Sequence, residues 1–99
     1  MGATALVASD SIVAMDVLRT LDRMGRRVPA DVSFVMLDDA PWSDLVPPGL
    51  TSVTQPVHEI GASAARLLLA RLTGDRHPVG VTRHATRLVV RGSTVPPRR

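Results

Sequence analysis

The 99-residue chain contains no cysteine, which excludes disulfide bonds, thiolate metal sites and a cysteine nucleophile. Aromatic residues are also scarce, since Phe34 and Trp42 are the only two. No apolar run approaches the roughly 20 residues that a membrane-spanning helix needs. The first residues also lack the basic stretch of a secretory signal. We therefore expect a cytoplasmic protein without membrane contact.

Lysine is absent as well, so all twelve basic residues are arginines, and they are unevenly distributed. Residues 1–65 carry eight acidic side chains against four arginines, whereas residues 66–99 carry eight arginines against one acid. A basic third of this kind raises the possibility of a nucleic-acid surface. Its arginines are not interleaved with aromatics that could stack on bases, so a solvated basic face is favoured.

The first 37 residues show the pattern of a strand, a helix and a second strand. Residues 4–8 form a short apolar run, and residues 9–11 offer side-chain oxygens for a helix N-cap. Apolar residues then recur at helical spacing up to Gly25, which fits a left-handed helix end. Residues 32–37 are almost continuously apolar, as in strands buried on both faces. The sequence therefore predicts a right-handed βαβ unit and an α/β fold class with a parallel sheet.

The rest of the chain predicts a further strand, a helix and an extended segment. Residues 50–54 are rich in β-branched side chains, and apolar positions at helical spacing follow over residues 57–72. Small residues in the first half of this helix permit close packing on a sheet. Residues 81–90 are expected to be extended, with the last three as their most buried part. Residues 94–99 are expected to be a frayed tail.

Polar side chains follow each of the three predicted parallel strands. Asp10 follows the first, Asp38 and Asp39 follow the second, and Gln55 follows the third. Ligands of open parallel sheets bind beyond the carboxyl ends of the strands. A carboxylate accepts hydrogen bonds from neighbouring hydroxyl groups, and glutamine both donates and accepts. The pattern therefore predicts a site for a polyhydroxylated small molecule, with Asp38 as its strongest candidate residue.

Three of the candidate residues have structural alternatives. Asp10 fits a helix N-cap as well as it fits a ligand contact. Asp39 fits a solvated or turn-forming carboxylate better than a ligand contact. Trp42 can stack on the apolar face of a sugar ring, but a loop anchor or an interface residue is somewhat favoured.

Catalytic and metal-binding patterns are missing. His58, His77 and His84 lie in three different predicted elements without metal-ligand spacing, and we expect them at the surface. There is no glycine-rich phosphate loop and no nucleophile elbow. Asp38 and Asp39 are adjacent, so their side chains would point in opposite directions and would not share a substrate. We expect no enzymatic activity, no metal and no cofactor.

A family resemblance rests on three segments, VPADVSFVMLDDAPW, PPGLTSVTQPVHEIGASAARLLLARLTG and TRLVVRGST. Their ordered motifs VPxD, DD, PxLTS, QP and RxST resemble the effector-binding core of LacI/GalR-family transcriptional regulators, and the resemblance covers residues 3–96. It implies the C-terminal part of a periplasmic-binding-protein-like (type I) sensor domain. In this family a sugar or related metabolite binds between two α/β subdomains of a homodimer. DNA would bind only through a helix-turn-helix that this chain lacks.

The resemblance also implies a division of the chain. Residues 1–54 would belong to the C-terminal subdomain and residues 55–85 to the N-terminal subdomain. Residues 86–95 would return as a strand, and residues 96–99 would form a tail.

The resemblance assigns roles residue by residue. It matches Asp10, Asp38, Gln55 and Val57 to ligand-contacting positions, to which Trp42 is added from its place in the following loop. It matches Met15 and Leu45 to positions of the dimer interface.

The sequence departs from the family pattern at several of these places. Asp10 replaces an asparagine, Asp16 replaces a helix glycine, and Met36-Leu37 replaces a glycine and an aromatic residue. These departures leave the ligand class open. The alternative function is a dimerisation module that does not respond to ligand.

Overall fold

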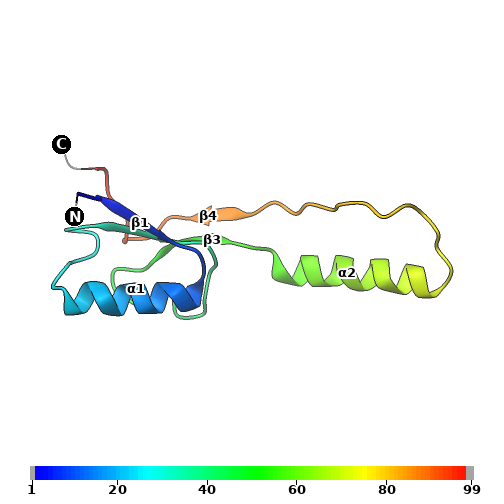
Figure 1. Cartoon of the computed structure of the whole chain (residues 1–99), viewed down its shortest axis with the longest axis horizontal. Helices are drawn as coiled ribbons and strands as arrows, with labels where there is room; N and C mark the ends of the chain where they lie inside the picture. The colour runs from blue at the N-terminus through cyan, green and yellow to red at the C-terminus, as the bar shows by residue number, and fades with distance from the viewer. Residues whose placement is uncertain (1, 98–99) are drawn as a thin grey trace. The chain divides into compact units, whose positions relative to one another are not determined.

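The computed structural model describes residues 2–97, which contain four strands and two helices. In chain order these are β1 (Ala5–Ala8), α1 (Ser11–Arg23), β2 (Ser33–Met36), β3 (Thr51–Thr54), α2 (Val57–Leu72) and β4 (Arg87–Val89) (Figure 1). The chain divides into two compact units. Unit 1 comprises the residues up to Thr54 together with those from Arg87 onward, and unit 2 is Gln55–Thr86.

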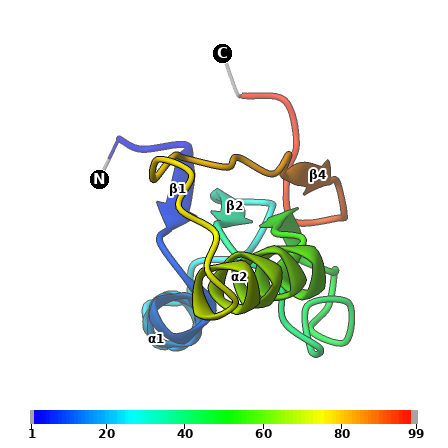
Figure 2. The same ribbon diagram turned by 90° about the vertical axis from the view of Figure 1, so that its right-hand side faces the viewer.

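Unit 1 is built on one four-stranded sheet with the order β1-β2-β3-β4. The first three strands are parallel, and β4 runs antiparallel to β3. Helix α1 connects β1 to β2 and lies on one side of the sheet in both views (Figures 1 and 2). The predicted βαβ unit and the parallel sheet are therefore confirmed.

The core of unit 1 lies between α1 and the sheet. Phe34 and Met36 of β2 are completely buried, and Ala8, Ala14 and Leu50 join them in one cluster. The prediction of a buried second strand is confirmed, except that Leu37 beyond its end is exposed. A central strand with neighbours on both sides buries its side chains more completely than an edge strand does, which explains why β2 dominates the core.

Both predicted ends of α1 are present. The Asp10 side chain caps the helix by accepting a hydrogen bond from the backbone N–H of Val13 at 2.8 Å. Gly25 adopts the left-handed conformation at φ 70°, one residue after the C-cap Met24. The chain can therefore turn sharply toward β2 without the steric cost that a Cβ would impose there.

Within residues 81–90, which were expected to be extended, only Arg87–Val89 pair as a strand. Of the three residues expected to be most buried, Val89 is partly buried, whereas Leu88 and Val90 are 58% and 70% exposed. Leu88 lies on β4, an edge strand that pairs with β3 alone.

Close packing of the second helix on a sheet, which its small residues permit, is not seen within unit 2. Helix α2 is present at nearly the predicted bounds, but none of its residues is buried. The described residues of unit 2 contain this helix and a following loop without any strand, so its apolar side chains have no sheet in their own unit to cover them. The exposed ones include Val57, Leu67, Leu68 and Leu72.

The prediction of a frayed tail over residues 94–99 was wrong for Thr94 and Val95, which hydrogen-bond to the sheet. Arg98 and Arg99 lie outside the described residues. Thr94 forms a hydroxyl–hydroxyl hydrogen bond with Thr51, and the backbone N–H of Val95 donates to the hydroxyl of Ser33. The tail is therefore fastened to the amino ends of β2 and β3.

Ser93, just before the tail, makes the deepest of these contacts. It is fully buried, accepts from the backbone N–H of Thr51 at 2.8 Å and donates to the carbonyl of Phe34 at 2.6 Å. One hydroxyl thus satisfies backbone groups of two neighbouring strands.

Candidate ligand-binding edge of the sheet

The carboxyl ends of β1, β2 and β3 lie at one edge of unit 1. Ala8 pairs with Met36, and Met36 pairs with Ser52. Asp10 lies two residues beyond the end of β1, and Asp38 lies two residues beyond the end of β2. Both therefore follow the carboxyl ends of neighbouring parallel strands.

Asp10 and Asp38 are both partly buried, but their carboxylates are used differently. Oδ1 of Asp10 is occupied by the helix cap. The carboxylate of Asp38 forms no hydrogen bond or ion pair with any other residue between 2 and 97. Asp38 is therefore the better placed of the two to accept hydrogen bonds from a ligand.

Gln55 and Val57 belong to unit 2. Gln55 directly follows the last residue of β3 in the chain, and its side chain is exposed. Val57 is the first residue of α2 and is 69% exposed. Their assignment to the ligand site remains a prediction.

Asp39, which the sequence favoured as a solvated or turn-forming carboxylate rather than a ligand contact, is partly buried in an ion pair. Its two oxygens accept two hydrogen bonds from the Arg91 guanidinium, from Nη1 to Oδ1 and from Nη2 to Oδ2, each 3.1 Å long. The Ser52 hydroxyl donates to Oδ1 at 2.9 Å. The side chains of Asp39 and Arg91 are only 28% and 21% exposed, so this forked ion pair is a partly buried structural link.

These partners change the acidity of Asp39. The hydrogen bonds from Arg91 contribute most to holding its pKa well below the usual aspartate value, and those from Ser43 and Ser52 act in the same direction. Partial burial opposes them and is outweighed. The charged form of Asp39 is therefore strongly preferred in the folded state.

Acid is expected to destabilise unit 1 through this residue. A carboxylate with a depressed pKa stabilises the folded state above its unfolded-state pKa, which is about 3.9 for aspartate. That stabilisation is lost as the pH falls below this value toward the folded-state pKa. Urea unfolding between pH 7 and pH 3 should therefore show a smaller loss of stability in Asp39→Asn than in the unsubstituted protein. Equal losses would contradict the assignment.

Arg91 is the residue that the sequence reasoning missed. It was seen only as the arginine of the RxST motif, among other arginines expected at a solvated face. The available signal was the presence of both the DD and the RxST motif. A partly buried arginine needs an acidic partner, and the DD motif offers one. No residue spacing indicates that this partner lies 52 positions earlier in the chain.

Trp42 lies close to residues of α1. It is partly buried, packs on the core cluster, and lines a shallow pocket with Met15, Leu18, Arg19 and Val46. The structure thus brings Trp42 together with Met15, one of the two residues assigned to the dimer interface. Leu45, the other, is 74% exposed in the same loop as Trp42.

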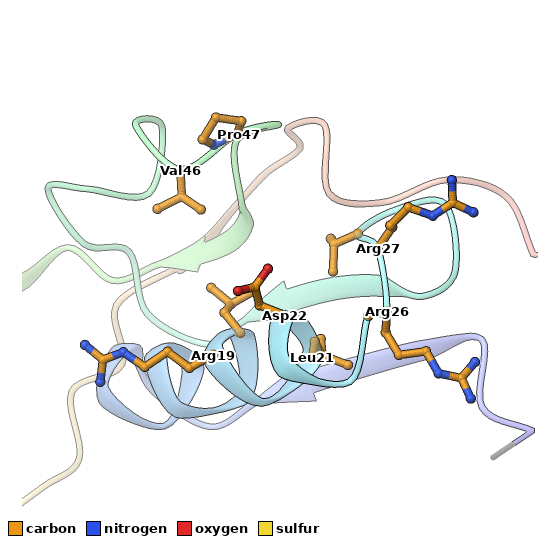
Figure 3. Close-up of a pocket in the computed structure, with 10 residues that line it drawn as sticks. Arg19, Leu21, Asp22, Arg26, Arg27, Val46 and Pro47 are labelled. Carbon is orange, nitrogen blue, oxygen red and sulfur yellow. The ribbon is translucent and has the colours of Figure 1, made fainter.

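A cavity of about 540 Å³ in unit 1 lies away from the carboxyl edge. It sits at the C-terminal end of α1, between this helix and Val46-Pro47 (Figure 3). Three arginines line it, but their guanidinium groups extend outward in different directions in Figure 3. They do not converge on one anion, so size alone does not make this cavity the candidate site. The three are Arg19, Arg26 and Arg27.

Neither a metal-binding cluster nor a membrane-spanning helix is found among residues 2–97. His, Asp and Glu side chains do not gather there into a group of three or more that could hold a metal ion. Neither described helix has both the length and the hydropathy to cross a bilayer.

Comparison with known proteins identifies the family. The model of the periplasmic binding protein-like domain matches residues 1–94. The transcriptional regulator PtxS of Pseudomonas aeruginosa, an HTH-type regulator, is 39% identical over 95 residues, which cover 96% of this chain and 28% of PtxS. The chain thus spans little more than a quarter of that relative.

Solved structures agree with this result. A LacI family regulator of Enterococcus faecalis with bound ribose superposes with a TM-score of 0.91 at 28% identity, covering 99% of this chain and 37% of that one. A LacI family regulator of Arthrobacter in complex with lactose gives 0.77 at 32% identity, covering 91% and 34%. The chain belongs to the periplasmic binding protein-like domain family, in the form found in LacI-family transcriptional regulators.

Proposed function

We propose that this chain is the small-molecule sensing and dimerisation portion of a LacI-type transcriptional regulator, and that its effector is a sugar. The observation that carries the proposal is the partly buried Asp38 carboxylate, which follows the central strand β2 and has no partner within residues 2–97. The relatives with bound ribose and lactose support the same ligand class.

In this proposal Asp38 accepts hydrogen bonds from two adjacent hydroxyl groups of the sugar. Asp10, one strand away, contributes its second oxygen, while its first caps α1. Gln55 adds an amide that donates and accepts, and Val57 provides an apolar contact. The packing of Trp42 beside Met15 favours its role as a loop anchor over sugar stacking.

The complete regulator would act in the cytoplasm as a homodimer. Met15 and the exposed Leu45 would contribute to its interface. DNA would be bound by a helix-turn-helix outside these residues, and the sugar would change how the dimer holds its operator. The chain itself would carry out no catalysis.

Replacing Asp38 by alanine is expected to weaken sugar binding. One charge-assisted hydrogen bond contributes about 1.5–3 kcal/mol, so affinity should fall by roughly 10- to 100-fold. The measurement is the thermal shift of the complete protein with a panel of sugars and nucleosides. Asp16→Ala, which removes an exposed carboxylate of α1, is the matched control and should respond like the unsubstituted protein. An unchanged response in Asp38→Ala would remove this residue from the site.

The alternative function, dimerisation without a ligand response, is favoured by one feature of unit 1. Large apolar side chains are exposed on and near α1, including Ile12 at 75% and Leu45 at 74%. Sedimentation of the complete protein with and without ribose, together with the thermal-shift panel, separates the two functions. A dimer that responds to no member of the panel supports the alternative.

A further inference from the structure

We infer that the Asp39–Arg91 ion pair positions Asp38 for ligand binding. The inference rests on the proposed function, since it concerns the same carboxyl edge. Asp39 and Arg91 are positioning residues in this role, and neither is proposed to touch the ligand.

Both members of the Asp39–Arg91 ion pair make further hydrogen bonds that hold them in place. Nη1 of Arg91 donates to the backbone carbonyl of Leu50 at 2.7 Å and to the Ser52 hydroxyl at 3.1 Å, besides its bond to Asp39. Leu50 and Ser52 are both buried, at 1% and 0% exposure. The guanidinium is therefore held against β3, and the Asp39 carboxylate is held against the guanidinium.

This arrangement determines what the two adjacent acids do. Asp39 is one peptide bond away from Asp38, just beyond the end of β2, so fixing the Asp39 side chain restricts the backbone that carries the Asp38 carboxylate. Holding the carboxylate of Asp39 against Arg91 and Ser52 leaves that of Asp38 without a protein partner. The forked geometry also restricts rotation more than a single hydrogen bond would. The Asp38 carboxylate is thus oriented before the ligand arrives, which lowers the entropic cost of binding.

A double-mutant cycle tests the inference in the complete protein. Asp39→Asn and Arg91→Gln each leave one charge without its partner, whereas the double variant removes both. Thermal stability should fall in each single variant and recover at least partly in the double one, because no unpaired charge then remains. Ribose affinity, measured by calorimetry, should be about tenfold weaker in all three variants than in the unsubstituted protein, a difference of roughly 1.4 kcal/mol.

Ser33→Ala is the matched control. It removes the contact between the C-terminal segment and the amino end of β2, away from the carboxyl edge. We expect it to lower thermal stability without changing ribose affinity. Backbone hydrogen exchange at residues 37–40 adds a readout that needs no ligand, and it should rise in the double variant but not in Ser33→Ala.

Two results would overturn the inference. One is ribose affinity in the double variant that returns to within twofold of the unsubstituted protein as stability recovers. The other is unchanged exchange at residues 37–40. An unsubstituted protein that binds no sugar of the panel, combined with raised exchange in the double variant, would instead reject the sugar ligand and retain the positioning of Asp38.

Discussion

Phe34→Ala is expected to lower the free energy of unfolding by about 3–5 kcal/mol, the range found for large-to-small changes at buried aromatic positions. Phe34 is completely buried in the central strand and forms the core of unit 1 with Ala8, Ala14, Met36 and Leu50. A loss of this size is a large fraction of the stability of a small domain, which is about 5–15 kcal/mol.

Urea unfolding of the complete protein, followed by circular dichroism, measures this loss. Leu88→Ala is the matched control, because it removes an apolar side chain from the edge strand at 58% exposure. It should cost no more than about 0.5 kcal/mol, as is usual for surface positions. If the two variants unfold at similar urea concentrations, Phe34 does not form the core described here.

Gly92→Ala has the second large expected effect, a loss of about 3 kcal/mol at the upper end of the usual range for overpacking. A Cβ at Gly92 would lie 2.5 Å from the carbonyl oxygen of Pro48 and 2.8 Å from its Cβ. The oxygen belongs to the backbone, so it cannot rotate away. Relief would require moving the segment between the Arg91 ion pair and buried Ser93, which would disturb both.

Gly61→Ala is the control, because it makes the same glycine-to-alanine change at a position with open space. Gly61 lies within α2, and nothing is found within 4 Å of the Cβ that it would gain. Alanine is favoured over glycine inside helices by about 1 kcal/mol, so helix content should hold or rise. Thermal unfolding followed at 222 nm compares the two variants. A Gly92→Ala protein as stable as Gly61→Ala would contradict the close approach of Pro48.

The local pattern of the sequence was sufficient for the elements of unit 1. Apolar runs of strand length, a helix with a polar cap at Asp10 and a glycine stop at Gly25 are short-range signals, and each was confirmed. The place of Asp10 and Asp38 at one edge also follows from local information. Parallel strands joined by a crossover present their carboxyl ends on the same side.

Long-range contacts were beyond the reach of these patterns. The sequence reasoning favoured Asp39 as a solvated or turn-forming carboxylate and treated the tail from Thr94 as frayed, because both segments are polar. In the folded chain they come within hydrogen-bond distance of distant partners, Asp39 of Arg91 and Val95 of Ser33. Polarity predicts exposure only where no complementary group is near, and proximity of this kind is a tertiary property.

The amino-acid sequence alone determined the α/β class, the bounds of the helices to within a few residues, and the family, since these depend on periodicity and on ordered motifs. Only the tertiary structure decided which of two neighbouring aspartates is engaged by an arginine, and that β4 is a largely exposed edge. The physical reason is that burial and ion pairing depend on which segments meet in space. Segments that meet here, such as those around Asp39 and Arg91, are separated by 52 positions along the chain.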